Sequence, residues 1–170
     1  MTLIEKILEM KGDKPNGLLE DFAVEGGGKY KELEYIIIFR SMGFRCGYVL
    51  IPKDHQLYDL PEGYGGLPEL EKLNVHGGIT FNGYMEDLLE QITELPKDQK
   101  KIYLIGFDAC HEYDGYDFDA RDKIWTSKLL PPREFFLETQ SNFLITIKSY
   151  EFMEAQCKHL IDQLVGDVVI

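Results

Sequence analysis

The segment of residues 33–52, LEYIIIFRSMGFRCGYVLIP, limits the fold of this chain more than any other stretch. Two apolar runs, rich in β-branched and aromatic residues, lie on either side of Ser41-Met42-Gly43. This pattern is typical of two consecutive strands joined by a turn. Pro52 then closes the second run, since a proline cannot donate a hydrogen bond within a sheet. We therefore expect a pair of neighbouring strands over these residues.

Two further apolar segments indicate that the sheet extends beyond this pair. Residues 101–107, KIYLIGF, are almost wholly apolar and predict a central, buried strand that ends at Asp108. Residues 75–81, VHGGITF, predict another strand, although Gly77 and Gly78 weaken it. Glycines inside a strand often mark a bulge or a place where another group closely approaches the backbone.

Apolar residues at helical spacing predict helices in several parts of the chain. A capping box formed by Thr2 and Glu5 predicts that a first helix begins at Thr2. Residues 85–95, MEDLLEQITEL, also have helical spacing, and a last helix is expected from Ser149 to about Val165. The apolar face of this last helix would comprise Met153, Cys157, Leu160, Ile161 and Leu164.

Two shorter segments complete the expected architecture. Residues 25–29, EGGGK, are expected to form a flexible loop, and residues 143–148, FLITIK, a last strand. No internal repeat or domain boundary is visible in the sequence, so residues 1–170 are expected to form a single domain. The order of the elements predicts the α+β class, with a mostly antiparallel or mixed sheet and flanking helices.

The net charge of the chain, −12 at pH 7, restricts its partners. Such a charge argues against nonspecific nucleic-acid binding, which requires lysine and arginine to neutralise phosphates. It suits a protein that engages a basic protein surface, although such a charge more commonly serves solubility alone. No apolar run approaches the roughly 18 residues that cross a bilayer, and residues 1–10 lack the features of a secretory signal. We therefore expect a cytoplasmic protein that does not bind membranes.

Three of the four histidines stand where apolar segments begin or end. His55 follows the second predicted strand, and His76 opens the third; His111 comes just after Asp108 in a D-x-x-H pattern. Taken one at a time, such residues are more typical of turns and surfaces. Together, imidazole nitrogens and a carboxylate oxygen suit zinc, with iron or manganese as alternatives. The candidate metal ligands are therefore His55, His76, Asp108 and His111.

A shared site requires a particular arrangement of the strands. His76 precedes its strand, whereas Asp108 ends its own, so the two residues meet only if these strands run antiparallel. Parallel strands would separate them by about 20 Å, the length of roughly six residues. The same rule brings His55 next to His76 only if their strands are antiparallel. The sequence leaves both arrangements open.

Other residues near these histidines offer weaker alternatives. Cys46 and Cys110 are metal ligands of second choice. Cys110 and His111 do not form a convincing nucleophile–base pair, because adjacent side chains on an extended chain point apart. Residues 112–122, EYDGYDFDARD, contain five acids and are expected to form a solvated loop or a contact surface for a basic partner.

Three blocks of the sequence resemble an uncharacterised protein family found in phages, prophages and bacteria. RCGYVLIPKDH, VHGGITF and IGFDACH are similar to the GYV-x-x-P-x-x-H, VHGG-x-T and GFD-x-x-H blocks of that family. A weaker similarity reaches AQCKHLIDQL in the last helix. Family members often have GFDCAH where this chain has GFDACH. This difference argues against Cys110 as a fixed ligand and leaves Asp108 and His111 as the matching positions.

A small acidic protein that resembles a phage family is also similar in kind, though not in its residues, to anti-CRISPR proteins of type II systems, some of which bind a metal. The first hypothesis is therefore a phage- or mobile-element-type accessory protein in which a bound zinc ion cross-links loops. Its acidic surface would bind a basic protein, such as a CRISPR effector nuclease, and inhibit it. The second is a metal-dependent hydrolase that uses three ligands and a bound water, with Asp114 or Glu112 as general base. Four protein ligands would favour the first hypothesis, and an open position beside a cleft would favour the second.

Overall fold

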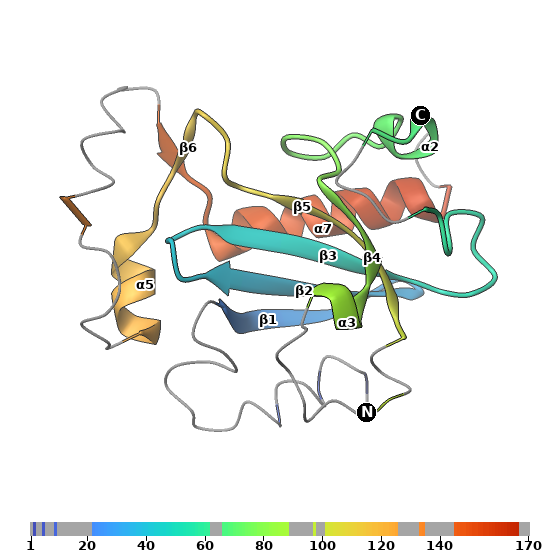
Figure 1. Cartoon of the computed structure of the whole chain (residues 1–170), viewed down its shortest axis with the longest axis horizontal. Coiled ribbons are helices and arrows are strands. Elements are labelled where there is room, and N and C mark those ends of the chain that lie inside the picture. The colour runs from blue at the N-terminus through green and yellow to red at the C-terminus, as the bar shows by residue number, and fades with distance from the viewer. Residues whose placement is uncertain are drawn as a thin grey trace.

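The computed structural model describes residues 2, 5, 9, 22–61, 66–88, 97, 101–125, 133–134 and 145–166. Their elements follow in the order β1 (Phe22–Tyr30), β2 (Leu33–Arg40), β3 (Arg45–Ile51), α2 (Pro68–Glu71), β4 (Phe81–Tyr84), α3 (Met85–Leu88), β5 (Tyr103–Asp108), β6 (Asp114–Gly115), α5 (Phe118–Ile124), β7 (Thr146–Ile147) and α7 (Tyr150–Leu164). One sheet has the strand order β1-β2-β3-β5-β4, and β6 and β7 form a separate pair. Figure 1 shows α7 running behind the larger sheet.

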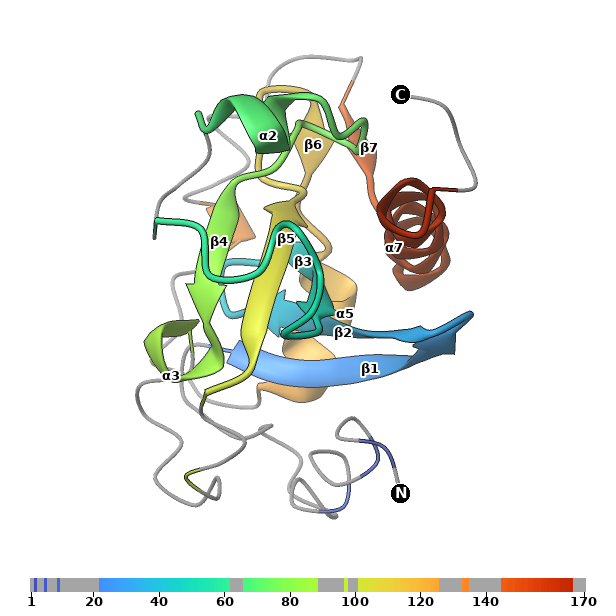
Figure 2. The ribbon, with the colours of Figure 1, turned by 90° about the vertical axis from the view of Figure 1, so that its right-hand side faces the viewer.

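The larger sheet is antiparallel at each of its pairings, whereas β6 and β7 run parallel. The helix α7 packs against β1, β2 and β3, and Figure 2, which looks along α7, shows it on one side of the sheet. This arrangement confirms the α+β fold with a mostly antiparallel sheet and flanking helices. None of the helices in the described ranges has the length and apolar character needed to cross a membrane.

The strand pair β2–β3 forms as the sequence predicts, with its turn at Ser41-Met42-Gly43. The Arg40 amide donates to the Phe44 carbonyl, and the Gly43 amide donates to the Arg40 carbonyl, both at 2.8 Å. Gly43 has a φ angle of +106°, which other residues rarely adopt. The turn therefore sets the register of the two strands.

Residues 25–29 are part of the edge strand β1, so the prediction of a flexible loop there is wrong. β1 pairs with β2 from end to end, with a bulge between Val24 and Gly26. A Cβ atom at Gly26 would collide with the ring of Tyr150 in α7. Pairing with an apolar neighbour and the close approach of α7 therefore outweigh the low strand propensity of the glycines.

The prediction of a strand at residues 75–81 is wrong for all but its last residue, because β4 comprises Phe81–Tyr84. The preceding residues form a turn in which Gly77 and Gly78 have φ angles of +68° and +80°. Positive φ angles are incompatible with a regular strand. The glycines thus end the strand pattern and start a turn.

The last helix, α7, forms where the sequence predicts it. The Ser149 hydroxyl caps it by accepting a hydrogen bond from the Phe152 amide at 3.1 Å. The predicted apolar face is buried, and it comprises Met153, Cys157, Leu160, Ile161 and Leu164. Regular spacing of apolar residues over fifteen residues was therefore sufficient to predict this element.

Other predicted elements are described only in part. The capping box of Thr2 and Glu5 makes both of its hydrogen bonds, at 2.6 and 3.1 Å, and the rest of that helix lies outside the described residues. α3 covers the start of the predicted helix at 85–95, and residues 89–95 are likewise outside. Within the predicted strand at 143–148, β7 comprises Thr146–Ile147, and residues 143–144 are not described.

A buried arginine connects α5 to the larger sheet. Arg45, in β3, has a side chain that is 6% exposed and binds both carboxylate oxygens of Glu25 in β1, at 2.6 and 2.8 Å. It also donates to Asp117, the residue that caps α5, at 2.8 Å. The charge of Arg45 is therefore balanced by two acids from different parts of the fold.

Candidate metal centre

Three donor groups from separate segments meet near the end of β5. His76 comes from the turn before β4, His111 from the turn after β5, and Asp114 from β6. One ligand atom from each residue lies within 4.8 Å of the others. His76 Nε2 is 2.9 Å from both carboxylate oxygens of Asp114, and His111 Nδ1 is 3.0 Å from Asp114 Oδ2. We call these three residues the His–His–Asp cluster.

A tight turn holds His111 and Asp114 together. The Asp114 amide donates to the His111 carbonyl at 2.9 Å, and the His111 amide donates back to Asp114 Oδ2 at 3.0 Å. The Thr146 amide in β7 donates to the Tyr113 carbonyl at 3.1 Å, which ties the turn to the neighbouring strand. Aspartate commonly closes turns by accepting backbone hydrogen bonds. Here the same carboxylate also faces the His111 ring.

His76 is held against the first half of α7. Its amide donates to Gln156 Oε1 at 2.9 Å, and its ring packs edge-on against Phe152 with 5.3 Å between centroids. The next residue, Gly77, is in the left-handed region, and a Cβ atom there would overlap the ring of His111. Glycine therefore follows the histidine because the second imidazole occupies the space of a side chain.

Asp114 is an ionised carboxylate almost shielded from water. Its side chain is 1% exposed, whereas those of His76 and His111 are 22% and 36% exposed. Burial by itself raises the pKa of Asp114, but hydrogen bonds from His76 and His111 outweigh burial and lower that pKa. Lys148 adds a positive charge, with its Nζ 3.6 Å from Asp114 Oδ1. The cluster is thus closed on the aspartate side and opens to solvent on the histidine side.

The distances within the cluster suit a metal ion. Zinc binds nitrogen and oxygen at about 2.0–2.2 Å, which places neighbouring ligands of a tetrahedral site about 3.3 Å apart. The nitrogen–oxygen distances of 2.9 and 3.0 Å to Asp114 are close to this value. Small side-chain shifts would therefore admit an ion. Without an ion, the same contacts form a hydrogen-bonded group that links three segments of the fold.

His55, the first of the predicted ligands, lies at the opposite end of the sheet. β3 and β4 each pair antiparallel with β5, so they run parallel to each other. His55 follows the end of β3, where Ile51 pairs with Tyr103, whereas His76 precedes the start of β4, where Phe81 pairs with Gly106. The two histidines therefore lie beyond opposite ends of β5. His55 Nε2 is 2.9 Å from the Leu164 carbonyl, and its Nδ1 accepts from the Leu57 amide at 3.1 Å. His55 therefore links the loop after β3 to the end of α7.

Asp108 ends β5 as predicted and lies at the edge of the cluster. Antiparallel pairing of β4 with β5 brings it to the end of the sheet that holds His76, as a shared site requires. Its Oδ1 lies 3.9 Å from His111 Nδ1 and accepts from the Cys110 amide at 3.0 Å. Asp108 and Cys110 also line a cavity of about 510 Å³, together with Cys46. His76, His111 and Asp114 do not line this cavity.

Asp114 completes the cluster, although the sequence suggested it only as a general base. The signal that could have identified it is the spacing of His111 and Asp114, H-x-x-D, which is typical of a turn closed by an aspartate. That signal is weak, because Asp114 is one of five acids within residues 112–122.

The other acids of this segment are mostly paired with cations. Asp117 binds Arg45, and Arg133 Nη2 lies 3.0 Å from Asp119 and 2.7 Å from Asp122. Glu112 is exposed. Residues 112–122 therefore combine a buried carboxylate and a helix cap with ion pairs, and this differs from the predicted solvated loop.

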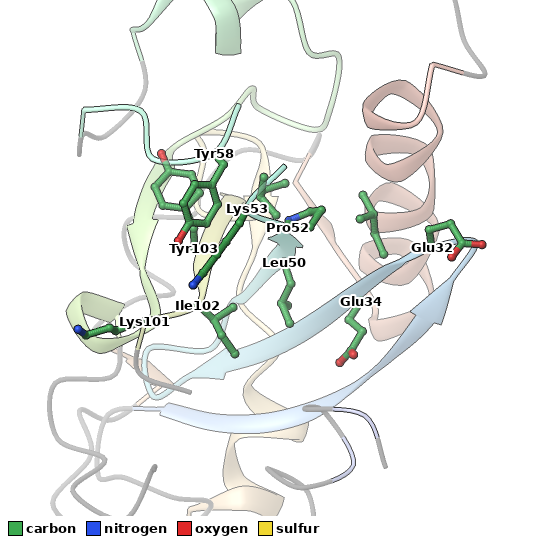
Figure 3. Close-up of a pocket in the computed structure, with 11 residues that line it drawn as sticks. Glu32, Glu34, Leu50, Pro52, Lys53, Tyr58, Lys101, Ile102 and Tyr103 are labelled. Carbon is green, nitrogen blue, oxygen red and sulfur yellow. The ribbon is translucent and has the colours of Figure 1, made fainter. Parts of the chain in front are cut away.

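A separate groove of about 540 Å³ lies at the sheet end away from the cluster, where β3 ends and β5 begins. Figure 3 shows the rings of Tyr58 and Tyr103 side by side at one end of this groove, and the carboxylates of Glu32 and Glu34 at the other. The groove contains none of the predicted metal ligands.

The chain was compared with protein-family models, curated proteins and solved structures, and none of the three comparisons found a significant match. The likeness of its sequence blocks to a phage family therefore stays a prediction.

Proposed function

We propose that the protein binds a divalent first-row metal ion, zinc most readily, through His76, His111 and Asp114. The observation that carries this proposal is the convergence of two imidazoles and one carboxylate, from three separate segments, within 4.8 Å. Zinc takes these ligand types in proteins, and iron or manganese can share them. The ion would replace the protons that otherwise join the two rings to Asp114.

An open coordination position is the feature that favours catalysis. Three protein ligands leave room for a water or a substrate group. The partial exposure of both rings supports such a position. We therefore favour metal-dependent hydrolysis, in which the ion activates its bound water. Asp108, 3.9 Å from His111 Nδ1, is the candidate general base.

The alternative proposal is a phage-type accessory protein that acts by binding another protein. In this alternative the ion would cross-link loops, and the acidic surface of the protein would bind a basic surface such as that of a CRISPR effector nuclease. The net charge of −12 supports this alternative. We rank it second, because Asp117, Asp119 and Asp122 are already paired with arginines. A cytoplasmic location belongs to both proposals.

Calorimetric titration of chelator-treated protein with Zn²⁺ tests the site. We expect the wild type to bind a single ion and His76→Ala to bind it more than about 100-fold more weakly, because even an outer-sphere partner of a ligand contributes 10–100-fold. His159→Ala, which removes a histidine of α7 outside the cluster, is the matched control and should bind as the wild type does. Equal affinity in His76→Ala and wild type, or no binding by either, would remove the proposal.

Activity separates the two uses of the ion. Turnover of carboxylic esters or phosphoesters by the zinc-loaded wild type, lost in His76→Ala, would support hydrolysis. Metal binding without turnover, together with specific capture of a basic nucleic-acid-binding protein, would support the accessory-protein alternative instead.

A further inference from the structure

Lys148 is a cation held beside the His–His–Asp cluster, and the proposed metal site gives it no role. Its Nζ lies 3.6 Å from Asp114 Oδ1 and 5.6 Å from the centroid of the Phe152 ring, and it also donates to the Thr146 hydroxyl. The side chain is only 16% exposed. A lysine that served solubility alone would extend its ammonium group into water.

Lys148 follows directly after β7, which ends at Ile147. Thr146 stands opposite Asp114 in the parallel pair β6–β7. Alternate residues of an extended chain point to the same side, so Lys148 shares the side of Thr146. Ile147, between them, is 55% exposed. The contacts of the ammonium group with Asp114, Phe152 and Thr146 hold it beside the cluster.

The charges around a bound ion would be unbalanced. A divalent ion and Lys148 together carry three positive charges, against one negative charge on Asp114 and one on Asp108 at the edge of the cluster. The side chains of Asp114 and Lys148 are 1% and 16% exposed, whereas the histidine side of the cluster is open to solvent, so water screens the excess charge only in part. An anion at the open coordination position would neutralise this excess.

We propose that the open position takes an oxyanion, a phosphate or carboxylate group, whose oxygens contact the ion and Lys148 Nζ together. Lysine binds such groups as a compact point charge. This inference rests on the proposed metal site and names the class of substrate that the site would bind. It also predicts that Lys148 leaves Asp114 and turns toward the anion when both the ion and the anion are bound.

Cobalt(II) is the probe for this inference, because its visible absorption responds to the ligands of a zinc-type site. Co²⁺-loaded wild type, Lys148→Met and Lys158→Met are titrated with phosphate, and separately with acetate, at constant ionic strength. Methionine keeps an unbranched stem beside Phe152 and removes the ammonium. Lys158 is the matched control, since it lies on α7 and pairs with Glu154 at 3.6 Å.

We expect a saturable spectral change in wild type and Lys158→Met, and an anion affinity about 10- to 100-fold lower in Lys148→Met. The Co²⁺ affinity of Lys148→Met should be equal to that of the wild type or higher. A response to phosphate alone assigns a phosphate group, one to acetate alone a carboxylate, and one to both the shared oxyanion chemistry.

Failure of this inference can be distinguished from failure of the metal site. Co²⁺ binding without a response to either anion, or with an equal response in Lys148→Met and wild type, overturns the inference and leaves the metal site in place. Absence of Co²⁺ binding by the wild type overturns the metal site, and the inference falls with it.

Discussion

Replacing Gly77 with alanine tests how the backbone positions the His–His–Asp cluster. The φ angle of +68° costs an alanine about 1–2 kcal/mol. In addition, the new Cβ would overlap the His111 ring and force it away from Asp114. A hydrogen bond to a charged group contributes about 1.5–3 kcal/mol, and the 36% exposure of His111 reduces this to about 1 kcal/mol. Gly77→Ala should therefore lower the free energy of unfolding by about 2–3 kcal/mol and the metal affinity more than about tenfold.

Gly78→Ala is the matched control for this experiment. Gly78 has a similar φ angle, +80°, but a Cβ atom there would have no neighbour within 4 Å. Gly78→Ala should lose only the free energy of unfolding that a positive φ angle costs an alanine, about 1–2 kcal/mol, and should keep its metal affinity. Urea unfolding in the presence of a chelator measures the stability, and calorimetry measures the metal affinity. Equal stability and equal metal affinity in the two variants would refute the reasoning.

Three further predictions concern the buried charges and thiols. Asp114→Asn should lower the free energy of unfolding of the metal-free protein by about 1–3 kcal/mol, measured in urea. The reason is that the hydrogen bonds from His76 and His111 to this side chain lose their charged acceptor. Arg45→Met should cost about 2–4 kcal/mol in the same assay, less than a fully buried pair, because its acidic partners are 20% exposed; a loss below 1 kcal/mol would contradict it. Near neutral pH a thiol reagent should label Cys110 before the other two cysteines, since it is exposed, and Cys110→Ser should remove this first phase. The labelling should be slower than that of a free thiol, because partial burial and the nearby Asp108 raise the pKa of Cys110. Cys46 and Cys157 should react only on unfolding, because burial raises the pKa of Cys46 to about 12 and also raises that of Cys157.

The parts of the fold that were predictable are those with a strong local pattern. Apolar spacing and the Ser149 cap predict α7, and Gly43 predicts the turn between β2 and β3. The strand β1 has no such pattern, because three consecutive glycines favour a loop over a strand. Its structure depends on pairing with β2 and on the contact between Gly26 and Tyr150, which is distant in sequence.

Only the part of the candidate site that depends on the relative direction of the strands was predictable from the sequence. The antiparallel pairing that a shared site requires does bring His76, His111 and Asp108 to one end of the sheet. The sequence could not show that β5 lies between β3 and β4, and this order carries His55 to the other end. Asp114 was hidden for a different reason, since its H-x-x-D spacing from His111 is only a weak signal among the five acids of residues 112–122.

X-ray absorption at the zinc edge of the zinc-loaded protein identifies the atoms around the ion and so tests whether the His–His–Asp cluster holds it. We expect nitrogen and oxygen ligands at about 2.0–2.2 Å. The imidazole contribution should fall in His76→Ala and in His111→Ala, and it should stay unchanged in His55→Ala. A sulfur ligand at about 2.3 Å, or an imidazole lost in His55→Ala, would contradict the account.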